Sequence, residues 1–431
     1  MIGDNRTIFG EFLTHTPLRF DYASPSCVAE TPYRGLSTFS AYDTTLPRNK
    51  SPRIAVMYPV NVRDFIPVFK HYFVNGYSRY PGLKRWFLLD INIFDEYPIQ
   101  YTNIYRDYFK ETEEIISKNY DFVFIIIERK EISRKIYSIL KSELLANGIP
   151  SQFINSDRLK LDRNFEWILM NLAVSFYAKI GGTPWVISAE ENMNLSPEIV
   201  IGISRAMDKN NNFLIGYTTI YKGNGDFILS KFQAPVSTYN AYEENLKNLV
   251  INSIEAYRRK QGEPQTIICH FHKKTSKREV DAVAKGIQDV ASDATYALLH
   301  LNSYSNFRVF DTSDNTFVPY EGLMVKLGSK QAILLTTGRN KNTGKIKMGT
   351  PVPIEITMDR RSTVRIKYFY DLVKQIYDFS RINWRGINAT AIPVTINYSK
   401  LIARLLGNIE NVANWNKIVN NGKLTNKAWF L

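Results

Sequence analysis

Between residues 53 and 180, short apolar runs alternate with stretches that have the spacing of amphipathic helices. Strands that alternate with helices favour a parallel sheet covered by helices, as in a Rossmann-like α/β fold. The expected strands are 53–60, 84–91, 121–127 and 151–155, and the expected helices lie near 62–75, 100–119, 131–147 and 164–180. In such a sheet the ligand site lies beyond the carboxyl ends of the strands, beside helix N-termini.

The pattern changes after Gly181 and Gly182. The short turn sequences DKNNN and KGNG then join three apolar runs, and turns of this composition favour antiparallel hairpins. The expected elements of this part are strands at 198–206, 212–221 and 226–232, a helix at 239–260, a strand at 266–272, a helix at 277–290, a strand at 295–302, a helix at 363–380 and a final helix after PVTINY (393–398). Three antiparallel strands followed by alternating helices and strands are the order of an RNase H-like fold.

Length and composition allow more than one packed domain. The chain has 431 residues, of which 44% are hydrophobic and 13% aromatic, so it can bury real cores and is not disordered throughout. Residues 1–50 show no regular spacing and are expected to form an extended segment that packs on the core. We place the first domain at 51–185 and the second at 186–431.

The charge balance is strongly basic, with a net charge of +14 and a pI of about 9.4. This surplus suits a phosphate-rich partner such as nucleic acid, although a solvated basic surface accounts for it as well. Cys27 and Cys269 lack the neighbours that a zinc site needs and fit a reducing cytoplasm. No apolar run approaches the roughly 20 residues of a membrane span, and the start of the chain lacks the apolar core of a signal peptide. We therefore expect a cytoplasmic protein without membrane insertion.

One helical run carries polar groups on a regular spacing. Tyr137 and Lys141 lie four residues apart, so their side chains share a helix face, and Gln152 follows in the next short apolar segment. A phenol, an ammonium and an amide that point to one place would suit an anion. Ordinary explanations exist for each group, because Tyr137 fits a half-buried core position and Lys141 fits a solvated helix face.

Two regions of the sequence resemble a known family. The segment INWRGINATAIPVTINYSKLIARLL (382–406), with the terminal WFL, looks like the end of a PIWI domain. The segments YSILKSELLANGIPSQF (137–153) and SFYAKIGGTPW (175–185) look like the matching MID domain. Together they resemble the short prokaryotic Argonautes of archaeal type, over roughly residues 50–431. The resemblance implies a Rossmann-like MID domain followed by an RNase H-like PIWI domain, with no N or PAZ domain.

The resemblance also implies a binding site for the 5′ phosphate of a guide strand, formed by Tyr137, Lys141, Gln152 and Lys179. Ammonium groups supply point charges, and the phenol can donate to a phosphate oxygen and stack on the first base. The family uses the carboxylate of the last residue, here Leu431, together with Gln152 to hold a divalent cation such as Mg²⁺ on the phosphate. Lys179 has an ordinary explanation too, because a lysine in the last turn of a helix complements the helix dipole.

The metal-binding acids of catalytic family members correspond to Ser204, His272 and Lys400 in this sequence. This set cannot replace the carboxylates that hold Mg²⁺, and the lysine ammonium would repel the ion. The resemblance therefore implies an inactive centre, with no catalytic residue and no enzyme activity. Asp208 and Glu279 lie nearby in sequence but are displaced by several residues, and an Mg²⁺-dependent endonuclease that uses such acids is the alternative. We expect His270 and His272 to be packed or hydrogen-bonded rather than metal ligands.

The function implied by the resemblance is guide-dependent binding of a complementary target without cleavage, with an RNA guide and a DNA target. Such proteins act in defence against plasmids and viruses, with a separate protein that supplies the missing N-terminal half and a toxic effector. Basic residues are implied to line the guide–target channel: Arg339, Lys341, Lys345, Lys347, Arg381 and Arg385. The other alternative is a sequence-independent single-strand binder held by charge, which would ignore whether the 5′ end carries a phosphate.

Overall fold

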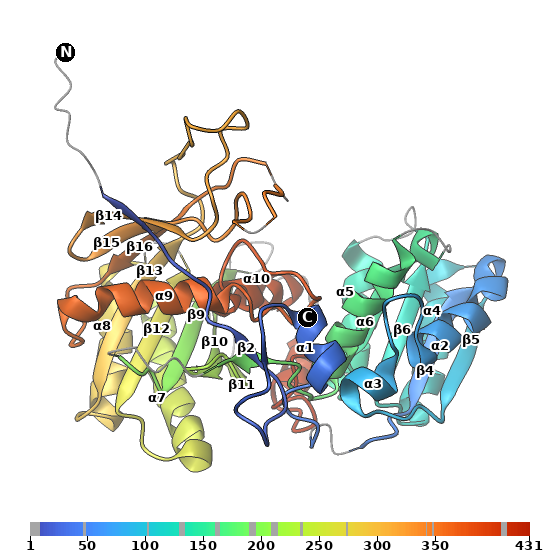
Figure 1. Cartoon of the computed structure of the whole chain (residues 1–431). Coiled ribbons are helices and arrows are strands. Elements are labelled where there is room, and N and C mark those ends of the chain that lie inside the picture. The colour runs from blue at the N-terminus through green and yellow to red at the C-terminus, as the bar shows by residue number, and fades with distance from the viewer. Residues whose placement is uncertain are drawn as a thin grey trace.

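The computed structural model describes residues 9–45, 49–100, 103–128, 134–159, 164–188, 195–207, 214–232, 236–272, 275–341, 343–346, 349–406 and 412–431. Figure 1 shows two lobes, one built on a large sheet and one on a small sheet, with the C-terminal end of the chain between them. No helix in these ranges is both long enough and apolar enough to cross a lipid bilayer.

The small lobe is built on a four-stranded parallel sheet in the order β5-β4-β6-β7, as the alternating pattern predicted. Its strands are β4 (Ile54–Pro59), β5 (Phe94–Ile99), β6 (Phe122–Ile127) and β7 (Ser151–Asn155), and its helices include α2 (Ile66–Asn75), α4 (Ile104–Ser117), α5 (Arg134–Ala146) and α6 (Phe165–Lys179). Helices α4 and α5 pack on one face of the sheet, and α2 and α6 pack on the other. Every residue of β6 is buried because helices cover both faces.

The prediction of a strand at 84–91 was wrong. Residues Leu83–Phe87 form helix α3, and the strand of this region is β5, which begins at Phe94. Leu83, Trp86 and Phe87 are buried at helical spacing, which an apolar run of this length does not distinguish from a strand. β5 was missed because it carries exposed acids and a proline, which are typical of an edge strand, and it pairs with β4 alone.

The large lobe contains, in the described ranges, a nine-stranded sheet in the order β1-β14-β15-β16-β13-β12-β9-β10-β11. Its central strands are β9 (Ile199–Met207), β10 (Leu214–Lys222), β11 (Phe227–Phe232), β12 (Thr266–His272) and β13 (Thr295–Asn302). The first three are antiparallel, and β12 runs parallel to both β9 and β13. This arrangement confirms the predicted RNase H-like order. The additional strands β14 (Leu323–Gly328), β15 (Gln331–Leu334) and β16 (Ile354–Met358) were not predicted.

Successive residues of β9 and β12 face opposite sides of this sheet. Ile201, Ile203 and Phe271 pack with α7 (Tyr239–Gln261) and α8 (Lys277–Val290). The intervening residues, such as Val200 and Ile268, belong to the core that contains α9 (Phe369–Phe379) and α10 (Val394–Leu406). Gly202 lets α10 approach β9 closely, because a Cβ atom there would lie 2.4 Å from the Thr395 carbonyl oxygen.

The N-terminal segment lies mainly along the large lobe (Figure 1). Strand β1 (Gly10–Phe12) pairs with β14, while β2 (Leu18–Arg19) joins β3 (Val28–Ala29) to β8 (Val186–Ile187). Helix α1 (Pro32–Phe39) follows. Buried polar contacts fix the segment, since Thr16 N and Oγ1 both donate to the carboxylate of Asp378, at 3.1 and 2.7 Å.

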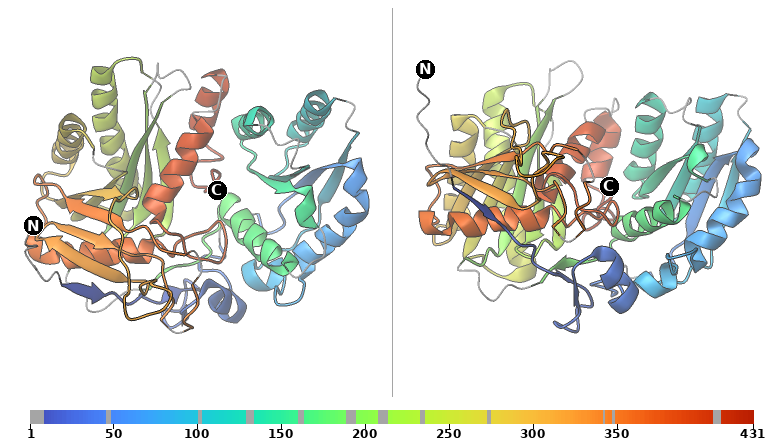
Figure 2. Two further views of the ribbon diagram at one scale, coloured as in Figure 1. Left: turned by 90° about the horizontal axis from the view of Figure 1, so that it is seen from above. Right: turned by 45° about the horizontal axis from the view of Figure 1, so that its top comes forward.

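The last part of the chain returns to the small lobe. Helix α11 (Val412–Val419) packs on α5, where Asn414 Nδ2 donates to Glu143 Oε1 at 2.6 Å. Asn421 Nδ2 donates to the carbonyl oxygen of Ala146 at the end of the same helix. Both views in Figure 2 place the C-terminal end of the chain between the two sheets. This return gives the two lobes a common boundary at α5 and α6.

Candidate nucleic-acid interface

The structure brings two of the predicted phosphate ligands onto a single acceptor. Lys141 on α5 and Lys179 at the end of α6 each donate from Nζ to the carbonyl oxygen of Ser151, at 3.0 Å. Lys179 also donates to Gln152 Oε1 on β7. Helices α5 and α6 and strand β7 of the small lobe therefore place two lysine side chains and one amide side chain close together.

Both lysines are buried, with 1% and 0% of their surface exposed. Burial and the nearby charge of Arg385 lower the pKa of Lys141 to about 7. Burial, the charge of Lys141 and the charge of Arg385 hold the pKa of Lys179 well below its usual range. Within the described part of the chain, no carboxylate forms an ion pair with either ammonium or raises its pKa. These shifts reflect the cost of burying an unpaired cation, and an anion bound here would favour the charged form of both lysines.

The charge of Arg385 lies near the lysine pair, and Arg385 is exposed. The structure places its charge close enough to affect the pKa of Tyr137, Lys141 and Lys179, although it comes from the other lobe. Its neighbours hold it there, because Trp384 Nε1 donates to the Trp185 carbonyl oxygen at 3.2 Å. The sequence analysis predicted Arg385 as a channel residue. The motif INWRG, which contains it, was the sequence feature that could have indicated a position near the phosphate site.

Tyr137 lies at the edge of the lysine pair. Its ring is half-buried and packs on Phe153 at 4.7 Å between centroids, and Lys141 Nζ lies 6.0 Å from its centroid. Burial raises the pKa of the phenol, so Tyr137 stays a neutral hydrogen-bond donor. A neutral donor beside two cations suits a phosphate oxygen.

Leu431 and the residues before it are tied to the same helix end. The backbone N–H of Ala428 donates to the carbonyl oxygen of Ala178, next to Lys179, at 3.3 Å, and Leu431 N donates to Ala428 O. Leu431 is buried. Within the described residues, no group of three or more His, Cys, Asp or Glu side chains could hold a metal ion.

The predicted channel residues divide into three groups. Arg339 is engaged internally, in ion pairs with Asp311 and Asp314 and against the ring of Tyr320. Arg381 is also internal, because it is buried and donates to the carbonyl oxygens of Thr16 and Glu30 in the N-terminal segment. Both arginines are therefore engaged within the fold, and their place in a guide–target channel stays a prediction.

The remaining cations of the 336–349 loop stay available on the surface. Lys341 is exposed, with Nζ 4.3 Å from the ring centroid of Phe12, and Lys345 is exposed as well. Lys347 lies outside the described residues.

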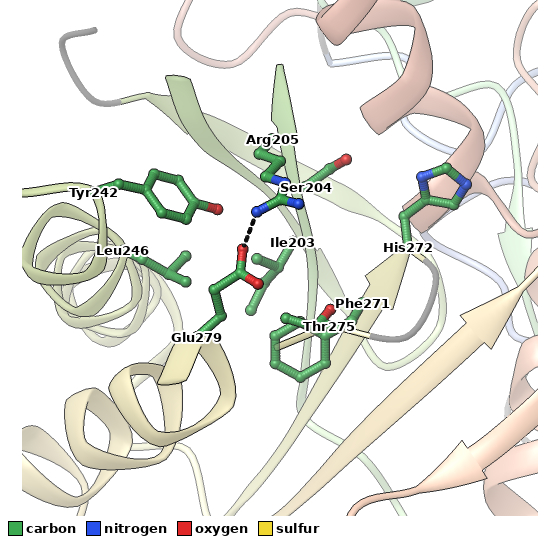
Figure 3. A pocket seen from close by; sticks show the side chains of 9 residues that line it. All are labelled: Ile203, Ser204, Arg205, Tyr242, Leu246, Phe271, His272, Thr275 and Glu279. Atoms are coloured by element: carbon green, nitrogen blue, oxygen red, sulfur yellow. Dashed lines mark hydrogen bonds and ion pairs between the residues drawn. The ribbon is translucent and has the colours of Figure 1, made fainter. Parts of the chain in front are cut away.

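Ser204, His272 and Lys400, the residues that the resemblance aligned with catalytic acids, lie on β9, β12 and α10 of the large lobe. Ser204 and His272 alternate with Ile203 and Phe271, and Figure 3 shows His272 pointing away from the side of the strands that Ile203, Phe271 and Leu246 occupy. Lys400 on α10 donates from Nζ to Ser303 Oγ at 2.9 Å.

Of the two displaced acids, Glu279 lies in the described part of the chain. Glu279 lies on the α7 and α8 side, where it accepts from Arg205 at 3.0 Å and caps α8 together with Ser276 (Figure 3). It shares a cavity of about 200 Å³ with Ile203, Tyr242 and Leu246. Asp208 lies outside the described residues.

His270 is a packed residue, as predicted. It is buried, and its Nδ1 forms a 2.9 Å hydrogen bond with Thr395 Oγ1 on α10. Burial lowers its pKa to about 3, so it stays neutral.

Comparisons with known proteins agree with this architecture. The family model described as "Piwi domain" matches residues 121–411. A "Piwi protein" of Archaeoglobus fulgidus is 26% identical over 415 residues, which cover 92% of this chain and 93% of that protein. A "Protein argonaute" of Cereibacter sphaeroides is 24% identical, and the match covers 94% of this chain and 56% of that protein.

Solved structures show the same fold. Clostridium butyricum Argonaute, in a structure with a guide DNA and a 19-mer target DNA, matches 94% of this chain with a TM-score of 0.75 and 18% identity. Drosophila Piwi matches 98% of it with a TM-score of 0.76 and 16% identity. The chain spans about half the length of these two proteins, 54% and 56%. With the Piwi model covering more than half of its residues, the chain belongs to the Piwi-domain family.

Proposed function

We propose that this protein holds the 5′ phosphate of a guide strand between Tyr137, Lys141, Gln152, Lys179 and Arg385, and uses the guide to bind complementary nucleic acid without cutting it. The observation that carries the proposal is the pair of buried lysine side chains, which share one carbonyl acceptor and have no carboxylate partner in the described part of the chain. A terminal phosphate with up to two negative charges would supply the missing counter-charge.

The likeness to a guide-bound structure supports the same proposal. The matched structure of Clostridium butyricum Argonaute contains a guide DNA and a target DNA. Comparing the affinity of wild-type protein for 5′-phosphorylated and 5′-hydroxyl strands tests recognition of the guide phosphate. Comparing the affinity of the guide-loaded protein for complementary and scrambled targets then tests guide-dependent binding. A binder held by charge alone would treat the two 5′ ends equally and would ignore complementarity.

The finer proposal is an RNA guide and a DNA target, in cytoplasmic defence against plasmids and viruses. A separate protein would supply the missing N-terminal half, and a toxic effector would respond to target binding. The resemblance of the sequence to short prokaryotic Argonautes supports these points. Sequencing the nucleic acid that copurifies from cells tests the guide and target, and affinity capture of the loaded protein tests the partner.

A divalent cation, Mg²⁺, completes the proposed phosphate site, with Gln152 and the carboxylate of Leu431 as its protein ligands. Gln152 Oε1 accepts hydrogen bonds from Lys179 Nζ and from Ser175 Oγ. Lys179 would therefore have to donate to the phosphate instead before this oxygen could bind a cation. Mg²⁺ would bridge phosphate and carboxylate oxygens and would have no catalytic part.

Residues added beyond Leu431 are expected to weaken binding of 5′-phosphorylated guides in Mg²⁺, because they displace the carboxylate from its buried position. The loss should be about tenfold, the scale of one ligand contact, and should shrink in EDTA. Guide affinities of the extended and unextended proteins, in both buffers, check this. Equal affinities in Mg²⁺ would contradict the metal bridge.

No site-specific cleavage is expected when the guide-loaded protein meets a complementary target in Mg²⁺ or Mn²⁺. The reason is that Ser204, His272 and Lys400 stand where two metal ions would need carboxylates. Denaturing gel analysis of end-labelled target checks this over long incubation. A guide-directed product that disappears in an Asp208→Asn variant would establish the endonuclease alternative instead.

A further inference from the structure

The carboxyl ends of β9, β12 and β13 carry a group of side chains that the guide pocket does not use. These strands are parallel neighbours, so their carboxyl ends meet at one edge of the sheet, where ligands commonly bind. His272 ends β12, Tyr304 lies two residues after β13, and Lys400 comes from α10, which packs on β9. We call His272, Tyr304 and Lys400 the strand-end cluster.

The cluster is held together by direct contacts. Lys400 Nζ lies 2.9 Å from Ser303 Oγ and 4.9 Å from the ring centroid of Tyr304. The rings of Tyr304 and His272 lie 6.1 Å apart between centroids. Tyr304 is nevertheless 62% exposed, so much of its side chain is accessible next to a positioned ammonium.

This chemistry fits a nucleic-acid strand. An exposed aromatic ring is a stacking surface for any base, and a lysine beside it neutralises a backbone phosphate. Ser303 adds a hydroxyl that can donate to the same phosphate. A cation is a poor fit, because the ammonium of Lys400 would repel it and because Glu279 is paired with Arg205 on the other side of the sheet.

We propose that the strand-end cluster is a metal-independent clamp for a nucleic-acid backbone, with a phosphate on Lys400 and Ser303 and a base or sugar against Tyr304. The clamp rests on the proposed function, since it acts on a strand of the guide–target complex. In this arrangement a fixed ammonium supplies the positive charge that metal ions supply in a nuclease of the same fold. The clamp holds the strand but has no group to cut it.

Target release from the guide-loaded protein tests the clamp. In EDTA, Lys400→Met should speed dissociation of a complementary target by about ten- to a hundredfold, the scale of one charge-assisted contact. The slope of log K for target binding against log salt concentration should decrease in magnitude by about one, as expected for the loss of one phosphate contact. Tyr304→Ala should also speed release, whereas Lys417→Met, a change of an exposed lysine on α11, should not. Lys400→Arg, which keeps the charge, should restore most of the retention.

A scan with single methylphosphonates, which remove one backbone charge at a time, identifies the bound phosphate. Wild-type protein should lose retention at one position or two adjacent ones, and Lys400→Met should be insensitive at the same position. Sensitivity in the target strand or in the guide strand distinguishes the two possible sources of the phosphate. Uniform sensitivity that Lys400→Met does not alter would overturn the clamp.

The scan also separates this inference from the proposed function. If wild-type protein fails to prefer complementary targets, the guide-dependent function fails first. If wild-type protein does prefer complementary targets, and Lys400→Met retains them as well as wild type does, only the proposal of a backbone clamp is wrong.

Discussion

Lys179→Met is expected to remove most of the preference for 5′-phosphorylated over 5′-hydroxyl guides. Truncating one partner of a buried, hydrogen-bonded charge pair costs about 2–5 kcal/mol, which is a loss of roughly thirtyfold or more. Methionine is apolar and close in length to lysine, so it keeps the packing at the end of α6. Equilibrium binding of the two guides to wild type and variant measures the difference.

Without bound guide, Lys179→Met should have a higher melting temperature than wild type. Lys179→Met removes a buried amine that has no carboxylate partner in the described ranges, and apolar groups often improve stability at such positions. Lys374→Met is a matched control, because Lys374 is also buried but is paired with Asp378 at 2.6 Å. That control should lower the melting temperature and leave the phosphate preference intact. A Lys179→Met protein that melts lower and keeps its preference would remove the basis of the phosphate site.

Affinity for 5′-phosphorylated guides is expected to fall as pH rises from about 7 to about 9. Lys141 has a pKa of about 7 in the free protein, and a bound phosphate raises that pKa because it favours the ammonium. Binding therefore takes up a proton above pH 7, and log K should fall by up to about one unit per pH unit for this group. The phosphate is already mostly a dianion there, since its second pKa is about 6.

Titrations of guide affinity against pH in EDTA measure this slope without a metal contribution. The 5′-hydroxyl guide should show little dependence, and Lys141→Met should make the curve for the phosphorylated guide shallower, with the remaining slope due to Lys179, whose pKa is also lowered. The stability of the empty protein should change in the opposite sense. Because the folded pKa of Lys141 lies below the unfolded value of about 10.4, the unfolded chain binds more protons between these values, so stability rises with pH across this window. A phosphate affinity that is constant from pH 7 to 9 would contradict the assignment.

The sequence predicted the local parts of the site better than the distant ones. The four-residue spacing of Tyr137 and Lys141 defines a helix face, and the structure confirms that both lie on α5. Arg385 could not be placed by spacing, because it comes from the other lobe and lies far from the lysines along the chain. The partners of Arg339 were equally hidden, since Asp311 and Asp314 lie on a separate loop that forms ion pairs across the fold.

The fold was predictable where the strands are central and buried on both faces. The apolar runs of β6, β9 and β12 were found at nearly their observed bounds. The short strands β14 and β15 mix exposed and buried positions and carry little periodic signal, so only their tertiary pairing defines them. The helix at Leu83–Phe87 was misread for a related reason, because five residues are too few to separate the two periods.

The packing of α11 on α5 has a consequence for biosynthesis. Asn414 and Asn421 satisfy groups on a helix that is synthesised some 270 residues earlier. Domains generally fold in order as they leave the ribosome, so the first lobe must wait with the α11-facing side of α5 uncovered while the second lobe is translated. Chaperone binding to nascent chains should concentrate on that interval and end once residues 412–421 emerge.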